Sequence, residues 1–185
     1  MLTRCMNIFE VKNNNKGSYE LTLGNLSFVC QVGFNGIIDN NKKIEGDSFT
    51  PAGLWGLKSV YYRPDKENLL KLISKNFFCF KKITKNCGWC NDYKSIDYNN
   101  HIKIITNGNL YSYSHEKLWR EDDAYDIFIE TGFNNDPIIP EKGSAIFIHC
   151  SFGDLRPTSG CVALSKENLI YLIKSITDDT KIKII

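Results

Sequence analysis

Short apolar runs separated by turn residues make up most of the chain, and they predict a strand-rich fold. Gly, Asn and Pro, which favour turns between short strands, bound these runs. The predicted strands are residues 19–23, 27–32, 102–105, 126–131 and 144–149. The predicted fold class is therefore mainly β, a mixed α+β domain.

Apolar residues recur at helical spacing near the C-terminus. The apolar face of this segment consists of Leu169, Ile170, Leu172, Ile173 and Ile176. Ser165 precedes it and can cap a helix with its hydroxyl. We also expect a second helix at 67–77. No repeat or linker interrupts the pattern, so one domain over 1–185 is predicted.

Composition and charge exclude several classes of partner. A hydrophobic fraction of 42% in 185 residues is enough for one ordinary core. The net charge is only +2 and the lysines are scattered, so nucleic-acid binding is not expected. A membrane span needs about 18 consecutive apolar residues, and none is expected here. The seven cysteines form an odd set, so at least one is unpaired within the monomer.

His149 and Cys161 are a candidate catalytic pair. His149 ends the predicted strand 144–149, and the turn residues from Pro157 to Gly160 return the chain to Cys161. An imidazole that takes the proton of a thiol produces the thiolate that attacks carbonyl carbon. Gly160 has no side chain, so N–H groups of Gly160 and Cys161 can approach a substrate oxygen. Spacing alone leaves a buried structural cysteine and histidine as the alternative.

Two other pairs of residues have chemical and structural interpretations. Cys87 and Cys90 have the spacing of a redox dithiol or of half a zinc site. The sequence offers no second cysteine pair of that spacing, which favours structural cysteines in a turn. His101 and His115 are alternative bases for Cys161, but core or solvent-facing roles are expected for both.

The segment that ends at Cys161 resembles the L,D-transpeptidase catalytic domain family, also called YkuD. Its signature is a histidine, a variable stretch, then Ser or Thr, any residue, Gly and a nucleophilic Cys. His149 and Thr-Ser-Gly-Cys at 158–161 match this signature, and Thr-Pro-Ala-Gly at 50–53 is similar to another family element. Matches to one branch of the family are residues 62–65, 88–91, 98–99, 118–123 and 143–146. The resemblance covers about residues 20–175.

This resemblance implies a β-sandwich with a few short helices, one of which follows the nucleophile. It implies Cys161 as nucleophile, His149 as general base and acid, and Gly160 as a backbone oxyanion donor, without a metal or cofactor. The expected partners are peptidoglycan stem peptides or muropeptides, and the expected role is bacterial cell-wall biogenesis and cell shape. Cys161 would form a thioester at an amide between an L-centre and a D-amino acid and pass the acyl group to an amine.

Two departures from the better-known members leave the outcome of the reaction open. Ser159 stands where they carry a second histidine, and Ala163 where many carry an arginine. The expected substrate-binding residues are Thr158, Ser159, Arg156, Arg63 and Trp119. Charged residues around Trp119 either line a peptide cleft or form a solvated surface. Hydrolysis, as in an L,D-carboxypeptidase or a toxin-like hydrolase, and an inert peptidoglycan-binding module are the alternatives to transfer.

The resemblance and the start of the chain predict different compartments. Peptidoglycan lies outside the cytoplasmic membrane, so the family implies a periplasmic or cell-wall-facing protein. The first residues contain no apolar stretch typical of a signal peptide. Activity inside a cell, export without a classical signal and a sequence shortened at its start therefore all stay open.

Overall fold

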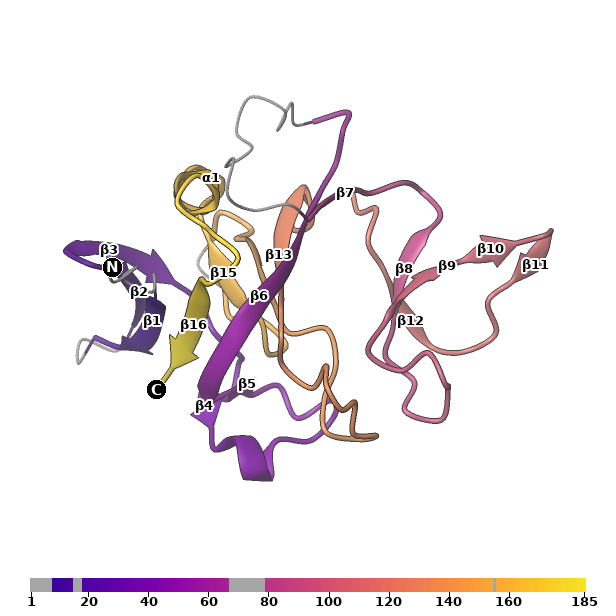
Figure 1. Cartoon of the computed structure of the whole chain (residues 1–185), viewed down its shortest axis with the longest axis horizontal. Coiled ribbons are helices and arrows are strands. Elements are labelled where there is room, and N and C mark those ends of the chain that lie inside the picture. The colour runs from indigo at the N-terminus through magenta and orange to yellow at the C-terminus, as the bar shows by residue number, and fades with distance from the viewer. Residues whose placement is uncertain (1–7, 15–17, 67–78, 155) are drawn as a thin grey trace, which may run out of the picture.

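A nine-stranded sheet is the main element of the computed structural model, which describes residues 8–14, 18–66, 79–154 and 156–185 (Figure 1). Its strands follow the order β15-β14-β13-β6-β16-β1-β2-β3, and β7 pairs with β6 off this path. Their bounds are β1 Ile8–Asn13, β2 Tyr19–Leu23, β3 Leu26–Cys30, β6 Gly53–Tyr62, β7 Phe80–Lys82, β13 Ile127–Thr131, β14 Phe147–Cys150, β15 Val162–Leu164 and β16 Lys181–Ile184. Bridges from Gln31 to Ala163 and from Gly33 to Thr158 join the segment after β3 to β15 and the loop before it, so the two edges of the sheet meet.

Smaller elements flank this sheet. They are β4 Ile37–Ile38, the 3-10 helix η1 Asn40–Lys42, β5 Thr50–Pro51, β8 Cys87–Cys90, β9 His101–Lys103, β10 Ile105–Thr106, β11 Asn109–Leu110, β12 His115–Lys117 and the helix α1 Lys166–Ile173. Strands β12, β8 and β9 form a three-stranded sheet in that order, and β10 and β11 form a hairpin. This small sheet and the hairpin lie on one side of β6 and β13, at the right of Figure 1.

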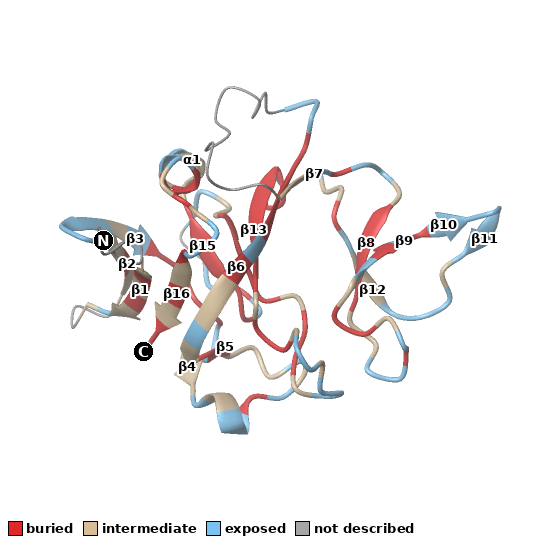
Figure 2. Ribbon diagram, viewed as in Figure 1, coloured by how far each residue is buried: buried red, intermediate tan, exposed pale blue. Residues whose placement is uncertain are grey.

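The central strands present alternate side chains to two cores, because successive residues of a strand point to opposite faces. Val60, Ile129 and Ile148 belong to the main core, which α1 also enters. Phe128 and Phe147 belong to a second core with residues of the small sheet, and their ring centroids lie 4.5 Å apart. The buried segments in Figure 2 follow the same central strands and β8.

Helix α1 confirms the predicted C-terminal helix. Ser165 caps it by accepting a hydrogen bond from the Asn168 N–H at 3.3 Å. Leu169, Leu172 and Ile173 are fully buried, and the helix packs against β14. The helix predicted at 67–77 lies outside the described residues.

The strand predictions are confirmed in part, and the mainly β fold class is confirmed. Strand β2 has the predicted bounds, and β3, β13 and β14 overlap the predicted segments. The segment predicted as one strand at 102–105 is divided between β9 and β10. The predictions missed β1, β4, β5, β6, β7, β8, β11, β12, β15 and β16. The observed sheet agrees with the β-sandwich that the family resemblance implied.

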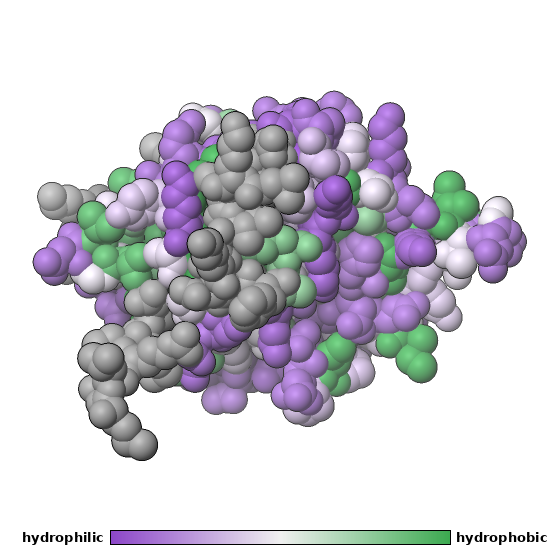
Figure 3. Space-filling model, turned by 45° about the horizontal axis from the view of Figure 1, so that its top comes forward, coloured by the Kyte–Doolittle hydropathy of each residue, from purple (hydrophilic) through white to green (hydrophobic). Residues whose placement is uncertain are grey.

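The surface is mostly hydrophilic on the face drawn in Figure 3, where apolar patches are scattered among polar residues. Within the described ranges, no helix has both the length and the apolar character needed to cross a membrane.

Candidate active site

Strand register brings the thiol of Cys161 and the imidazole of His149 to one face of the sheet. Strands β14 and β15 are parallel, with Ile148 opposite Val162 and His149 opposite Ala163. Cys161 comes directly before Val162, so its side chain points to the same face as that of His149. The two residues are 8% and 4% exposed, and both line one cavity of about 720 Å³.

Several segments that are distant in sequence form the walls of this cavity. One wall comes from the loop that contains residues 43–48, and another from β12 and residues 120–125. Residues 144–146 and 156–161 form the wall that carries the thiol. The nucleophile candidate therefore lies between the large sheet and the small one, in a space open to a peptide-sized ligand.

The His149 imidazole is oriented as a proton acceptor. Its Nδ1 lies 2.8 Å from the carbonyl oxygen of Cys150, which can only accept, so Nδ1 carries the hydrogen and Nε2 is the basic nitrogen. The Tyr125 ring packs edge-on against the imidazole at 5.4 Å. Burial lowers the pKa of His149 to about 4, although the hydrogen bond to Cys150 acts in the opposite direction. The resting imidazole is therefore neutral at neutral pH.

The Cys161 thiol is also neutral in the resting site. Its Sγ donates to the Ala145 carbonyl oxygen at 3.0 Å and accepts from the Phe147 N–H at 3.3 Å. Burial raises the pKa of Cys161 to about 12, and the negative charge of Glu116 adds to this effect. Among the described residues, Cys161 and His149 share the cavity without a hydrogen bond between them.

Hydrogen bonds fix the backbone just before the thiol. Thr158 Oγ1 donates to the Cys161 carbonyl oxygen at 2.6 Å and accepts from the Gly160 N–H at 3.1 Å. Gly160 has φ +143°, and an added Cβ would lie 3.0 Å from the Phe49 carbonyl oxygen, so this position requires glycine. Because the Gly160 N–H already bonds to Thr158, its predicted use as an oxyanion donor requires that bond to break. The Cys161 N–H is the other predicted donor.

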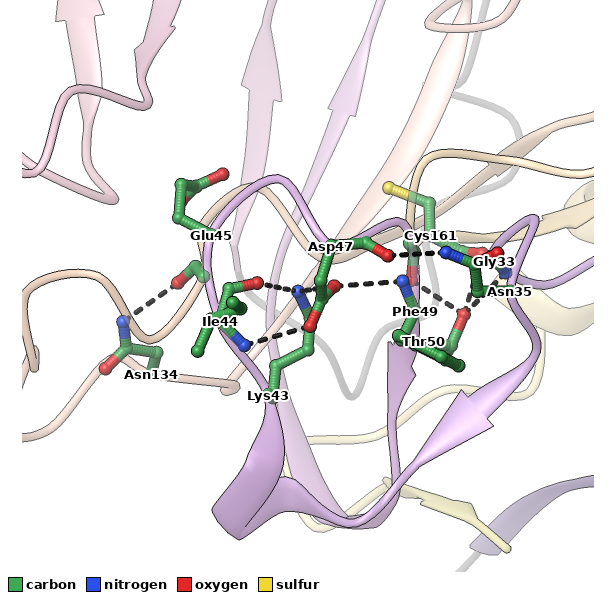
Figure 4. Close-up of polar contacts among 12 residues, drawn as sticks. Gly33, Asn35, Lys43, Ile44, Glu45, Asp47, Phe49, Thr50, Asn134 and Cys161 are labelled. Carbon is green, nitrogen blue, oxygen red and sulfur yellow. Dashed lines mark hydrogen bonds and ion pairs between the residues drawn. The ribbon is translucent and has the colours of Figure 1, made fainter.

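Thr50 is a positioning residue to which the sequence interpretation gave no role. It is fully buried, and its hydroxyl accepts from the Gly33 N–H at 2.8 Å and donates to the Gly160 carbonyl oxygen at 2.8 Å (Figure 4). One side chain thus ties the segment after β3 to the turn that carries Cys161. The family-like block at 50–53 was the available signal, but it could not show which backbone groups Thr50 contacts.

The predicted substrate-binding residues fall into two groups. Those that line the cavity are Thr158, Ser159 and Arg156. Arg63 and Trp119 are not among its lining residues, and the Arg63 guanidinium lies 3.5 Å above the centroid of the Trp119 ring. Arg63 also pairs with Asp65 at 2.7 Å and donates to the Arg120 carbonyl oxygen at 2.7 Å. The position of these two residues does not support the predicted substrate contact. The Arg63 guanidinium covers the face of the Trp119 ring, and neither side chain lines the cavity.

Other cavity residues were missed or were left between two interpretations. Glu116 and Arg120 line the cavity, so part of the charged run around Trp119 faces a cleft rather than open solvent. Antiparallel pairing of β12 with β8, with Glu116 opposite Trp89, places this carboxylate there. His115 lines the cavity too, whereas His101 is exposed and stacks on the Tyr61 ring at 5.7 Å.

Cys87 and Cys90 lie in strand β8, not in the predicted turn. Residues three apart in a strand point to opposite faces, so these thiols cannot meet in a disulfide or on one metal ion. Both are free. Across the described part of the chain, no group of three or more His, Cys, Asp or Glu residues could hold a metal ion.

Fold and site together define a candidate thiol enzyme of acyl transfer, with a cysteine and a histidine in one cavity of a mainly β protein. The chain belongs to the YkuD family, the L,D-transpeptidase catalytic domain, whose model matches residues 6–184. This match covers nearly the whole chain and makes it an enzyme of the L,D-transpeptidase type, a family that acts on peptidoglycan peptides. No curated protein and no solved structure matches the chain significantly.

Proposed function

We propose that this protein is a peptidoglycan-active cysteine acyltransferase, an L,D-transpeptidase, with Cys161 as nucleophile and His149 as general base and acid. The substrate bond is an amide between an L-centre and a D-amino acid of a stem peptide. The observation that carries the proposal is that His149 on β14 and Cys161, directly before the parallel strand β15, line one cavity. Because peptidoglycan lies outside the cytoplasmic membrane, we also propose that the reaction takes place there.

In the first half of the reaction, Cys161 Sγ leaves the Ala145 carbonyl oxygen and attacks the substrate carbonyl carbon. Nε2 of His149 takes the thiol proton during this attack and then gives it to the leaving amine as the C–N bond breaks. The Cys161 N–H, joined by the Gly160 N–H once it leaves Thr158, holds the negative charge on the carbonyl oxygen. The product of this half is a thioester on Cys161.

In the second half, the amine of another stem peptide attacks the thioester carbon. His149 takes a proton from this amine and returns it to the sulfur as the C–S bond breaks, so the enzyme ends in its starting state. Water can attack at the same point and would give carboxypeptidase activity. Exclusion of water from the cavity decides between the two acceptors.

The test is incubation with muropeptides, followed by mass spectrometry of the products. New cross-links or exchanged D-amino acids indicate transfer, loss of a terminal residue indicates hydrolysis, and unchanged muropeptides indicate a binding module. We expect Cys161→Ala to abolish turnover and Cys79→Ala, at a half-buried thiol that does not line the cavity, to retain it. Full turnover by Cys161→Ala would refute the mechanism.

A further inference from the structure

Two glutamates, Glu45 and Glu116, line the cavity that contains Cys161. Glu116 belongs to β12, and Glu45 to the loop that forms the facing wall. Burial raises the pKa of Glu116, and the charges of Asp122 and Glu45 add to this effect, so the Glu45 carboxylate is close enough to interact with that of Glu116. The Glu116 side chain is 29% exposed, so a ligand in the cavity can reach it.

The basic residues of the cavity are already paired with other acids. These pairs are Lys43 with Asp47 at 2.7 Å, Arg156 with Asp154 at 3.3 Å, and Arg120 with Asp122 at 2.9 Å. Each of these aspartates lies outside the set of residues that line the cavity. Each positive charge on the cavity wall is therefore paired with a carboxylate that does not line the cavity.

The two glutamates are held mainly by neutral hydroxyl groups. Tyr98 donates to Glu45 Oε2 at 2.5 Å, and Tyr125 donates to Glu116 Oε1 at 2.8 Å. Arg120 also lies 3.5 Å from Glu116, but its shorter, two-atom contact is with Asp122. A hydroxyl orients a carboxylate without cancelling its charge, so the cavity retains negative charge at these two residues.

We propose that Glu116, with Glu45 on the facing wall of the cavity, binds a primary ammonium group of the peptide substrate. The inference rests on the proposed function, whose acceptor is an amine, and an alkyl amine is protonated at neutral pH. An ammonium donates three hydrogen bonds and can contact both carboxylates at once. The ammonium belongs either to the acceptor or to the peptide that acylates Cys161, and the two sources predict different kinetics. An acceptor ammonium first gives one proton to the Glu116 carboxylate, which releases it to water, and the free amine then attacks the thioester.

Glu116→Gln is the variant that isolates the charge. Its amide oxygen can still accept the hydrogen bond from Tyr125, and Arg120 keeps its pair with Asp122, so the fold should be preserved. Glu121→Gln is the matched control, because Glu121 is exposed, does not line the cavity and loses the same charge.

The first measurement is binding, which needs no turnover. Calorimetric titration of Cys161→Ala uses a muropeptide with one free side-chain ammonium and the same muropeptide after N-acetylation. We expect about a tenfold preference for the free ammonium, retained with Glu121→Gln and lost with Glu116→Gln. Equal affinity for both ligands, or a preference that survives Glu116→Gln, would overturn the inference.

The second measurement identifies the source of the ammonium in the otherwise unmodified enzyme. If the acceptor supplies it, Glu116→Gln lowers the ratio of transfer to hydrolysis about tenfold and leaves the KM of the acylating peptide unchanged. If the acylating peptide supplies it, that KM rises and the ratio stays constant. A ratio and a KM that both equal those of Glu121→Gln would overturn the inference. Absence of turnover in the unmodified enzyme, with the binding preference present, would instead refute the proposed function alone.

Discussion

Cys87, rather than Cys161, is the thiol that we expect an alkylating reagent to modify first at neutral pH. The two residues are 7% and 8% exposed, and Cys161 lines the cavity whereas Cys87 does not, so access gives Cys87 no advantage. Burial raises the pKa of Cys87, but hydrogen bonds with His101 and Thr84 outweigh it and lower the pKa to about 7. Burial and the charge of Glu116 raise the pKa of Cys161 to about 12.

The rate difference follows from these two pKa values. At pH 7 about half of Cys87 is thiolate, whereas the thiolate fraction of Cys161 is about 10⁻⁵. The thiolate fractions of the two residues thus differ by about five powers of ten. A thiolate of higher pKa is intrinsically more nucleophilic, with a Brønsted coefficient of about 0.5, and this offsets about half of that difference. We therefore expect Cys87 to react about 300-fold faster than Cys161.

The assay is timed labelling with iodoacetamide from pH 6 to 9, with each cysteine-containing peptide quantified by mass spectrometry. The rate at Cys161 should rise about tenfold per pH unit across this range, while the rate at Cys87 levels off above pH 7. Cys87→Ser is the control that removes the fast phase. Faster labelling of Cys161 at pH 7, independent of pH, would show a preformed thiolate–imidazolium pair and refute the neutral resting site. Labelling of Cys87 alone is no sign of redox activity, since Cys90 points away from it.

Three further predictions concern stability and the nucleophile turn. Thr50→Val leaves the buried Gly33 N–H and Gly160 carbonyl unpaired, so urea unfolding should show a loss of about 2–4 kcal/mol, most of which Thr50→Ser avoids. Gly160→Ala should lower kcat, because the added Cβ would lie 3.0 Å from the Phe49 carbonyl oxygen at a φ of +143° and would shift the turn that carries Cys161. The circular dichroism spectrum should change little. Between pH 6.5 and 4 the unfolded chain protonates at His149 before the folded protein does, so stability should fall by about 3 kcal/mol as pH decreases, and His149→Gln should remove this contribution.

Local sequence patterns predicted helix α1, strand β2 and the apolar runs of β13 and β14, and they failed where a strand has no clear alternation or is short. Helix α1 and strand β2 show their period in the sequence. The end of β6 near Tyr62 is buried on both sides between the two cores, so its residues do not alternate between apolar and polar. Two glycines, Gly53 and Gly56, further weaken the signal. Strand β16 alternates Lys and Ile but is only four residues long.

Some residues of the candidate site are indicated by local sequence, and others reach it only through strand pairing between distant segments. His149 lies on β14 and Cys161 comes directly before the parallel neighbour β15, so spacing made them a candidate pair and the family signature favoured a catalytic one. Glu116 reaches the cavity only because β12 pairs with β8, which no local pattern specifies. Arg63 and Trp119 have the residue types of a substrate contact, and in the structure the Arg63 guanidinium stacks on the Trp119 ring outside the set of residues that line the cavity.

The neutral resting pair constrains how the proposed reaction can begin. Proton transfer from Cys161 to His149 spans eight pKa units, from about 12 to about 4, which is on the order of 11 kcal/mol before attraction between the new charges. A turnover of about 10 s⁻¹ corresponds to a barrier of about 16 kcal/mol, so an ion pair formed in a separate step would use most of it. If Sγ bonds to the substrate carbon while the proton moves, the negative charge goes to the carbonyl oxygen and its N–H donors rather than staying on a buried sulfur. An ammonium at Glu116 would also cancel the charge that raises the pKa of Cys161. The substrate thus completes the activation of a thiol that is unreactive in its absence.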